Sequence, residues 1–158
     1  MTPEEYGDRF KDHLLEQYKL YVEMADNVSS RRAQANMFYI SILSGLLAVL
    51  SIVARGSILK DITNVVFLAA AILGMIICCV WYVNLQSYRQ LNSGKFKVIH
   101  AMEQQLPFPC YGREWEIVGG GKDSKKYLQL TRVEQYVPAI LAIPYLILII
   151  HSLCVMIR

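Results

Sequence analysis

Two apolar runs separated by a short polar break constrain the fold of this chain more than any other feature. The first run extends from Met37 to Ala54 and the second from Ile62 to Val83, and neither contains a charged residue. A helix of about 18 or more uncharged apolar residues is long enough to cross the hydrocarbon core of a bilayer, which is roughly 30 Å thick. The break at residues 55–61 is only long enough to turn the chain around. The two runs therefore predict a membrane-spanning helical hairpin.

A third apolar run, Tyr136 to Ile157, is uncharged when His151 is neutral. Its two prolines are compatible with a spanning helix when neighbouring helices satisfy the freed carbonyl groups. We expect an all-α fold, an integral membrane helix bundle with three transmembrane helices, an N-terminal amphipathic helix and a cytoplasmic helical extension. The expected divisions are an N-terminal helix at 1–35, a transmembrane hairpin at 36–83, a cytoplasmic helical and loop region at 84–135 and a third transmembrane helix at 136–158.

Composition agrees with a membrane protein and excludes several classes of function. Charged residues make up only 18% of the chain, whereas a soluble domain has about 25%. The net charge of +3 is not clustered, so we expect no nucleic-acid partner. The four cysteines form no Cys-x-x-Cys pair and no cluster with histidine at metal spacing. We therefore expect no metal, no cofactor, no catalytic residues and no enzymatic activity.

The distribution of basic residues predicts the orientation of the spans. Lysine and arginine beside a span favour the cytoplasm, and they gather before the first span, after the second and before the third. The opposite side holds only Arg55, Lys60 and Arg158. This asymmetry predicts a cytoplasmic N-terminus, cytoplasmic residues 84–135, and an external break and C-terminus. The charged residues 2–36 contain no apolar core of a signal peptide, so the first span itself is expected to drive insertion.

The segment from Thr2 to Gln34 has the pattern of an amphipathic helix. From Phe10 to Val28, six positions follow at alternating steps of four and three residues, and all but Gln17 are apolar or aromatic. This period is typical of a coiled-coil seam. The seam can pack on the chain's own helices or between subunits around a symmetry axis, and both interpretations stay open. A helix lying on lipid is less favoured because acids outnumber bases here. The candidate seam residues are Phe10, Leu14, Tyr21, Met24 and Val28.

The region after the second span is expected to continue the same helix from Asn84 to Gln105. Two prolines at 107 and 109 then require an extended segment. Trp115, Ile117 and Val118 are expected to pack this segment against the helices. From Asp123 a further helix is expected to run into the third span.

Polar residues on the predicted cytoplasmic helix are candidates for ligand or lipid contact. Arg89 with Asn92 and His100 with Glu103 are pairs three residues apart, and Lys95 lies between them. One interpretation is a set of salt bridges and hydrogen bonds between helices. The other is a ligand site in a cytoplasmic vestibule, with Arg89 and Lys95 also near anionic lipid headgroups.

A face of small residues on the first span is the second candidate site. Ser41, Ser44, Ala48 and Ser51 follow at steps of three, four and three, with Arg55 at the outer end. Small residues four apart allow close packing of helices. The same face could instead line a pore in an oligomer, with a ring of arginines that favours anions. His151, an ionisable group within a span, is either functional or a neutral hydrogen-bonding group between helices.

Several stretches resemble the RipA family of small bacterial membrane proteins. The likeness covers roughly Leu14 to Trp115 and is carried by residues 81–99 with Glu103 and Leu106-Pro107, by Tyr18-Lys19-x-Tyr21 and by Ser29-x-Arg31-x4-Asn36. The resemblance implies an octamer in the bacterial inner membrane. The general plan is also similar to SLATT domains, membrane effectors thought to make pores, although a third span departs from their two-span plan. Neither likeness supplies a catalytic motif.

Two hypotheses about function follow from these features. The first is a homo-oligomeric ring, expected to be an octamer, that forms a pore or channel-like assembly in the inner membrane. The second is a non-conducting membrane scaffold that binds lipid or a partner protein. Both require self-association, for which closed ring symmetry is expected.

Overall fold

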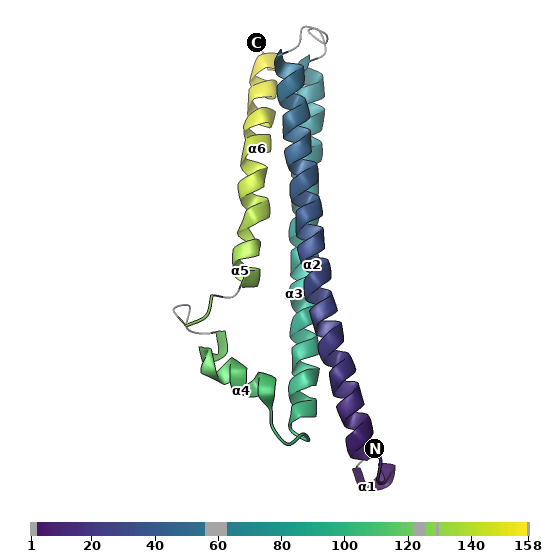
Figure 1. The fold of residues 1–158 in the computed structure, drawn as a ribbon. Helices are drawn as coiled ribbons and strands as arrows, with labels where there is room; N and C mark the ends of the chain where they lie inside the picture. The colour runs from purple at the N-terminus through teal and green to yellow at the C-terminus, as the bar shows by residue number, and fades with distance from the viewer. Residues whose placement is uncertain (1–2, 56–62, 122–125, 129, 158) are drawn as a thin grey trace. The chain divides into compact units, whose positions relative to one another are not determined.

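The computed structural model describes residues 3–55, 63–121, 126–128 and 130–157 of the chain. These residues contain helices and no strand (Figure 1), so the predicted all-α fold is confirmed. The elements in chain order are α1 (Pro3–Tyr6), α2 (Phe10–Arg55), α3 (Thr63–Glu103), α4 (Cys110–Ile117), the short 3₁₀ helix η1 (Gly119–Gly121), α5 (Leu130–Glu134) and α6 (Tyr136–Ile157).

Three of these helices contain the predicted apolar spans. The segments Phe10–Arg55, Asn64–Glu103 and Arg132–Ile157 are each long and apolar enough to cross a membrane. The three-span prediction is therefore confirmed. Apart from Arg55, the predicted hairpin turn lies outside the described residues.

The chain divides into two compact units, to which α2 and α3 both contribute. We call the unit of Met1–Arg32 and Ser87–Leu130 the extramembrane unit, because it lies outside the three apolar runs. The unit of Ala33–Gln86 and Thr131–Arg158 contains all three runs, and we call it the span unit.

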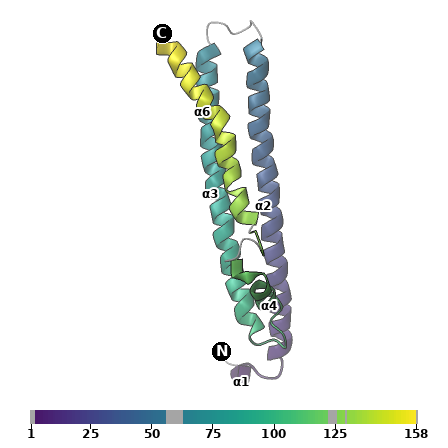
Figure 2. The same cartoon turned by 90° about the vertical axis from the view of Figure 1, so that its left-hand side faces the viewer.

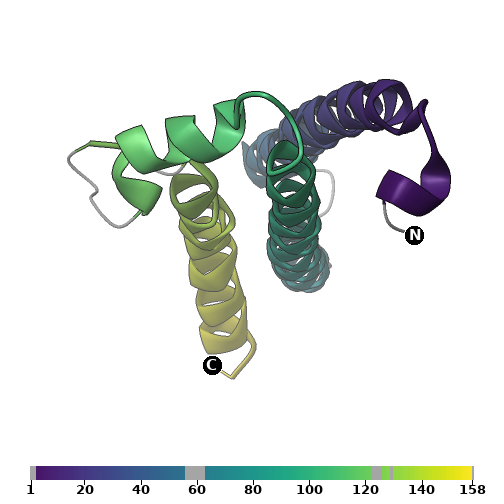
Figure 3. The ribbon, with the colours of Figure 1, turned by 90° about the horizontal axis from the view of Figure 1, so that it is seen from below.

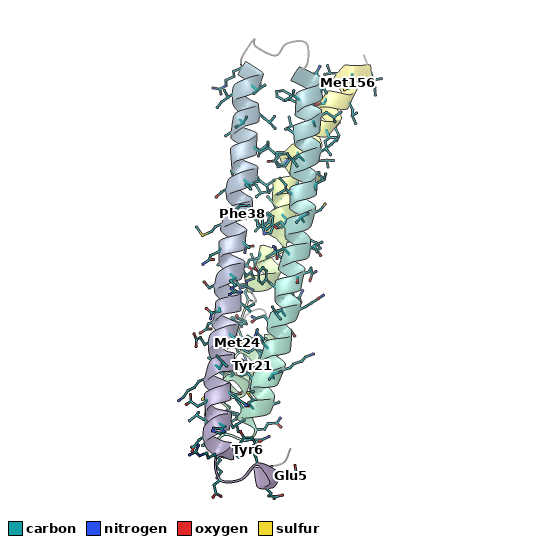
Figure 4. The ribbon with its side chains drawn as sticks, turned by 90° about the vertical axis from the view of Figure 1, so that its right-hand side faces the viewer. Glu5, Tyr6, Tyr21, Met24, Phe38 and Met156 are labelled. Atoms are coloured by element: carbon teal, nitrogen blue, oxygen red, sulfur yellow. The ribbon has the colours of Figure 1, made fainter. Side chains whose placement is uncertain are left out.

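The N-terminal helix and the first span form one continuous helix, α2, of 46 residues. The only glycine in this helix is Gly45 and it has no proline, so nothing in the sequence interrupts it. The predicted start at Thr2 differs from the structure, because the chain bends at Gly7 with a φ of 90°. Tyr6, just before the bend, makes edge-to-face ring contacts with Phe10 and His13, which follow it. Figure 4 labels Glu5 and Tyr6 at this end of the chain.

The predicted continuation of the second span is confirmed, since α3 runs without a break from Thr63 to Glu103. The prediction of a helix from Asp123 is wrong for the residues that the structure describes, because Lys126–Leu128 are not helical and α5 begins at Leu130. Tyr127 instead contacts the Trp115 ring edge to face, with 6.4 Å between the ring centroids.

The predicted packing is also wrong for Trp115 and Ile117, whose side chains are exposed, whereas Val118 is half-buried. The inward side of α4 carries Tyr111 and Gly112, which are half-buried. Ile117 is on the opposite side of so short a helix and therefore points away from α3. The segment is held by its backbone and by Tyr111 rather than by an apolar face.

The core of the span unit joins α2, α3 and α6, and α6 lies against α3 in this unit (Figure 2). Tyr145 of α6 is fully buried and donates a hydrogen bond of 2.6 Å from its hydroxyl to the Leu43 carbonyl of α2. Its ring lies on Gly74 of α3, where an added Cβ would overlap the ring. A single tyrosine thus connects the third span to both helices of the hairpin.

Polar and aromatic contacts also fix α2 against α3 in the span unit. Trp81 donates from Nε1 to the Asn36 side-chain oxygen at 2.9 Å, and its ring is stacked on Tyr39. Asn84 donates to the Tyr39 hydroxyl at 3.3 Å. Because each bond needs one particular pairing of positions, these contacts set the register of the two helices.

Candidate functional site

The small-residue face of α2 is left uncovered by the helices of its own protomer. Ser41, Ser44, Ala48, Ser51 and Arg55 are all exposed, whereas Leu43 and Leu50 on the other side of α2 are buried. Around Gly45, an added Cβ would meet nothing within 4 Å. The structure therefore places the five predicted residues on one open face, as their spacing requires.

The hydroxyl group of Ser51 on this face is satisfied within its own helix. Ser51 donates from Oγ to the Leu47 carbonyl of its own helix at 2.8 Å. Such a bond to the preceding turn satisfies a serine in a span without water or a partner helix. The face is thus compatible with a neighbouring helix as well as with water.

A buried carboxylate, Glu103, forms the most connected polar site of the extramembrane unit. Its exposed fraction is 1%. Oε1 accepts hydrogen bonds from the Tyr18 hydroxyl at 3.0 Å and from the Tyr111 backbone N–H at 2.7 Å. Oε2 accepts from the Gly112 backbone N–H at 2.9 Å. The last residue of α3 therefore holds both α2 and the first turn of α4.

Electrostatic interactions favour the position of the Glu103 carboxylate at the N-terminus of α4. A carboxylate at a helix N-terminus interacts favourably with the unpaired N–H groups there. Burial, followed by the hydrogen bond to Glu103, raises the pKa of the Tyr18 phenol. Burial and the nearby Asp26 carboxylate raise the pKa of Tyr111. The phenol of Tyr18 therefore keeps its proton and acts as a donor to Glu103.

The other candidates for ligand contact are spread along α3. The ammonium of Lys95 lies 5.0 Å from the centre of the Tyr21 ring, a cation–π contact with α2. His100 is half-buried with its ring 6.4 Å from Phe96. Arg89 and Asn92 are half-buried, and the buried Oδ1 of Asn92 has no hydrogen-bond partner in the structure. Lys95 and His100 thus contact aromatic side chains of their own unit, on α2 and α3 respectively.

The candidate oligomer seam packs partly within its own protomer. Leu14 is buried, and Phe10, Tyr21 and Val28 are half-buried. Figure 4 shows Tyr21 between α2 and α3, where it meets Lys95. Met24 is the most exposed member at 41%. The seam therefore packs partly within its own protomer, and a contact between subunits stays a prediction.

Sequence reasoning missed the residues that connect distant segments. Tyr145 carried no pattern signal, although a tyrosine in the middle of the third apolar run and a glycine in the second run could have suggested a close contact. Glu103 was paired with His100, whereas its actual partners are Tyr18 and the α4 backbone. In the part of the chain that the structure describes, no three histidine, cysteine, aspartate or glutamate residues could hold a metal ion.

The three apolar helices and the uncovered small-residue face define a helical membrane protein suited to association with other helices. Residues 15–154 match the octameric membrane protein family, and the chain belongs to this family. It is accordingly a homo-oligomeric membrane protein. Comparison with curated proteins and with solved structures gave no match.

Proposed function

We propose that eight copies of this chain form a ring in a bacterial inner membrane and that α2 lines a pore on its axis. In this assembly Ser41, Ser44, Ala48 and Ser51 face the axis, and Arg55 lies at the outer mouth. The observation that carries the proposal is that this polar face is exposed, whereas Leu43 and Leu50 on another side of α2 are buried. A ring of arginines at the mouth favours anions.

Further features of this proposal rest on the sequence. Basic residues beside the spans support a cytoplasmic N-terminus. The resemblance to RipA proteins supports the bacterial inner membrane, and the likeness to SLATT domains supports pore formation. Arg89 and Lys95 follow the second span closely enough for contact with anionic lipid headgroups. We propose that the assembly has no enzymatic activity.

Cysteine accessibility tests whether water reaches the proposed pore face. With the exposed Cys79, Cys110 and Cys154 replaced by serine, we expect Ser44→Cys to react with a charged, water-soluble thiol reagent in intact membranes. The matched control is Val49→Cys, since Val49 is exposed on a different side of the same helix and is expected to face lipid. The Ser44 variant should react at least about tenfold faster, because thiols react as the thiolate, which needs water. Equal, slow reaction at both positions would count against a water-filled pore.

A non-conducting scaffold is the second candidate, and the hydrogen bond of Ser51 favours it. A hydroxyl bound to Leu47 O at 2.8 Å needs no water, and small residues allow neighbouring helices to pack closely. In this arrangement the face lies between adjacent subunits, and lipid or apolar side chains fill the axis. Slow labelling at Ser44 together with an intact octamer would support the scaffold.

A further inference from the structure

Two tyrosines of the span unit have exposed side chains at the ends of apolar runs. Tyr82, next to the last residue of the second run, is 45% exposed. Tyr136, the first residue of the third run, is 69% exposed. Trp81, by contrast, is buried and binds α2. The two exposed rings therefore have a role other than packing within the protomer.

Contacts within the span unit place these two tyrosines at the same level along the helices. α6 runs beside α3 in the opposite direction (Figure 2 and Figure 3), and the Tyr145 ring lies on Gly74. Tyr136 lies nine residues before Tyr145, and Val83 lies nine residues after Gly74. At 1.5 Å per residue both positions are about 14 Å from this contact, in the same direction. Tyr136 is therefore level with Tyr82 and its neighbour Val83.

The exposed surface of the span unit changes from apolar to polar at this level. Toward the middle of the runs, Val80 of α3 and Ile140 of α6 are exposed. In the other direction α3 continues with Asn84 and Gln86, and α6 is preceded by Glu134 and Gln135.

The hydroxyl group of Tyr82 is bonded on the polar side of this boundary. Gln86, one turn farther along α3, donates from Nε2 to this hydroxyl at 3.2 Å. The ring of Tyr82 thus belongs to the apolar run and its oxygen to the polar surface.

The length of each helix beyond the tyrosines matches the thickness of a bilayer core. α6 extends about 32 Å from Tyr136 to Ile157, and α3 extends about 30 Å from Val83 back to Thr63. The hydrocarbon core is about 30 Å thick. When the far ends of both helices reach one surface of the core, the two tyrosines reach the other surface.

Tyrosine suits a membrane surface because its ring is apolar and its hydroxyl group is polar. Tryptophan and tyrosine are accordingly enriched where membrane meets water. The opposite ends of the three apolar runs, at residues 46–61, 62–73 and 146–158, contain neither residue type. Aromatic hydroxyl groups therefore distinguish one end of the span unit from the other.

We propose that Tyr82 and Tyr136 lie in the headgroup layer at one surface of the membrane and fix the depth of the span unit there. Their partner is lipid, because the tyrosines of two helices share a level that lies one core thickness from the far ends. A contact between copies would require no such agreement. The proposal does not depend on whether the ring conducts.

Nitroxide labels measure this depth in the full-length protein in phospholipid vesicles. With the three exposed cysteines replaced by serine, labels are attached to Tyr82→Cys, to Tyr136→Cys and, as the matched control, to Ile143→Cys, since Ile143 is exposed on α6. Oxygen relaxes labels in the core, and a water-soluble nickel complex relaxes labels in water. We expect the labels at 82 and 136 to agree within about 3 Å and the label at 143 to lie about 10 Å deeper, because it is about two turns away.

Three outcomes of this measurement would overturn the proposal. The first is a label at Tyr136→Cys as deep as that at Ile143→Cys. The second is access of the nickel complex equal to that at Glu16→Cys, since Glu16 is an exposed residue of the extramembrane unit. The third is protection of both tyrosine positions from both reagents, which would mean that another copy covers them.

Replacement of both tyrosines tests whether they fix the depth. With Tyr82→Ala and Tyr136→Ala combined, the label at Ile143→Cys should change depth by at least about 3 Å, the rise of two residues. The matched pair Tyr82→Trp and Tyr136→Trp should keep the depth, because tryptophan favours the same layer. Circular dichroism should show the same helix content for both pairs. An unchanged depth in the alanine pair would show that the tyrosines do not fix it. Conductance plays no part in this result, so the pore proposal can fail separately.

Discussion

At the scale of single residues, Glu103 shows how one buried carboxylate can organise a segment that has no apolar core. Its two oxygens accept three hydrogen bonds, two of them from backbone N–H groups of α4. In Glu103→Gln the amide nitrogen can only donate, so at least one N–H loses its acceptor, at a cost of about 1–3 kcal/mol. Hydrogen exchange at Tyr111 and Gly112 should therefore become about tenfold to hundredfold faster.

The exposed Glu114 provides the control for this prediction. Glu114→Gln removes a charge from the same helix without changing a buried hydrogen bond, and exchange at Tyr111 and Gly112 should stay as in the wild type. Equal exchange rates in both variants would mean that Glu103 does not hold α4.

At the scale of elements, the close approach of α6 to α3 depends on Gly74. The Tyr145 ring occupies the space that a side chain at this position would need. Gly74→Leu should therefore displace α6 and destabilise the span unit by about 1–3 kcal/mol, the usual cost of overpacking. A lower thermal midpoint in detergent, followed by circular dichroism, is the measurement.

Ala69→Leu is the matched variant, because Ala69 is exposed on the same helix. Its midpoint should remain close to that of the wild type. If Gly74→Leu is as stable as Ala69→Leu, the contact between Tyr145 and Gly74 is not what holds α6 to the hairpin.

At the scale of the whole molecule, the pore and scaffold proposals differ in what a bulky residue at position 44 does. In a pore, Ser44→Trp fills the axis, so the octamer should persist while single-channel conductance in planar bilayers falls at least about tenfold. Val49→Trp should conduct as the wild type does. An assembly that is silent in the wild type, or a Ser44→Trp octamer that conducts normally, contradicts the pore.

The features predictable from sequence were those set by neighbouring residues. The lengths of the apolar runs predicted the three spans, and the absence of proline between Asn84 and Gln105 predicted the extension of α3 to Glu103. The 3–4 spacing also placed Ser41, Ser44 and Ser51 on one face, because helical periodicity needs no knowledge of the partner. Predictions of what a side chain packs against were less successful. Ile117, for example, was expected to pack against the helices and is exposed.

By itself the sequence determined a three-span helical membrane protein with small residues on one face of its first span, since hydrophobic length and periodicity are local properties. Only the tertiary structure decided which residues of different helices contact one another. The bond from Tyr145 to Leu43 joins residues 102 positions apart, and that from Tyr18 to Glu103 joins residues 85 apart. Such contacts depend on how complete helices pack, and a buried polar group is stable only when that packing brings its partner within hydrogen-bonding distance.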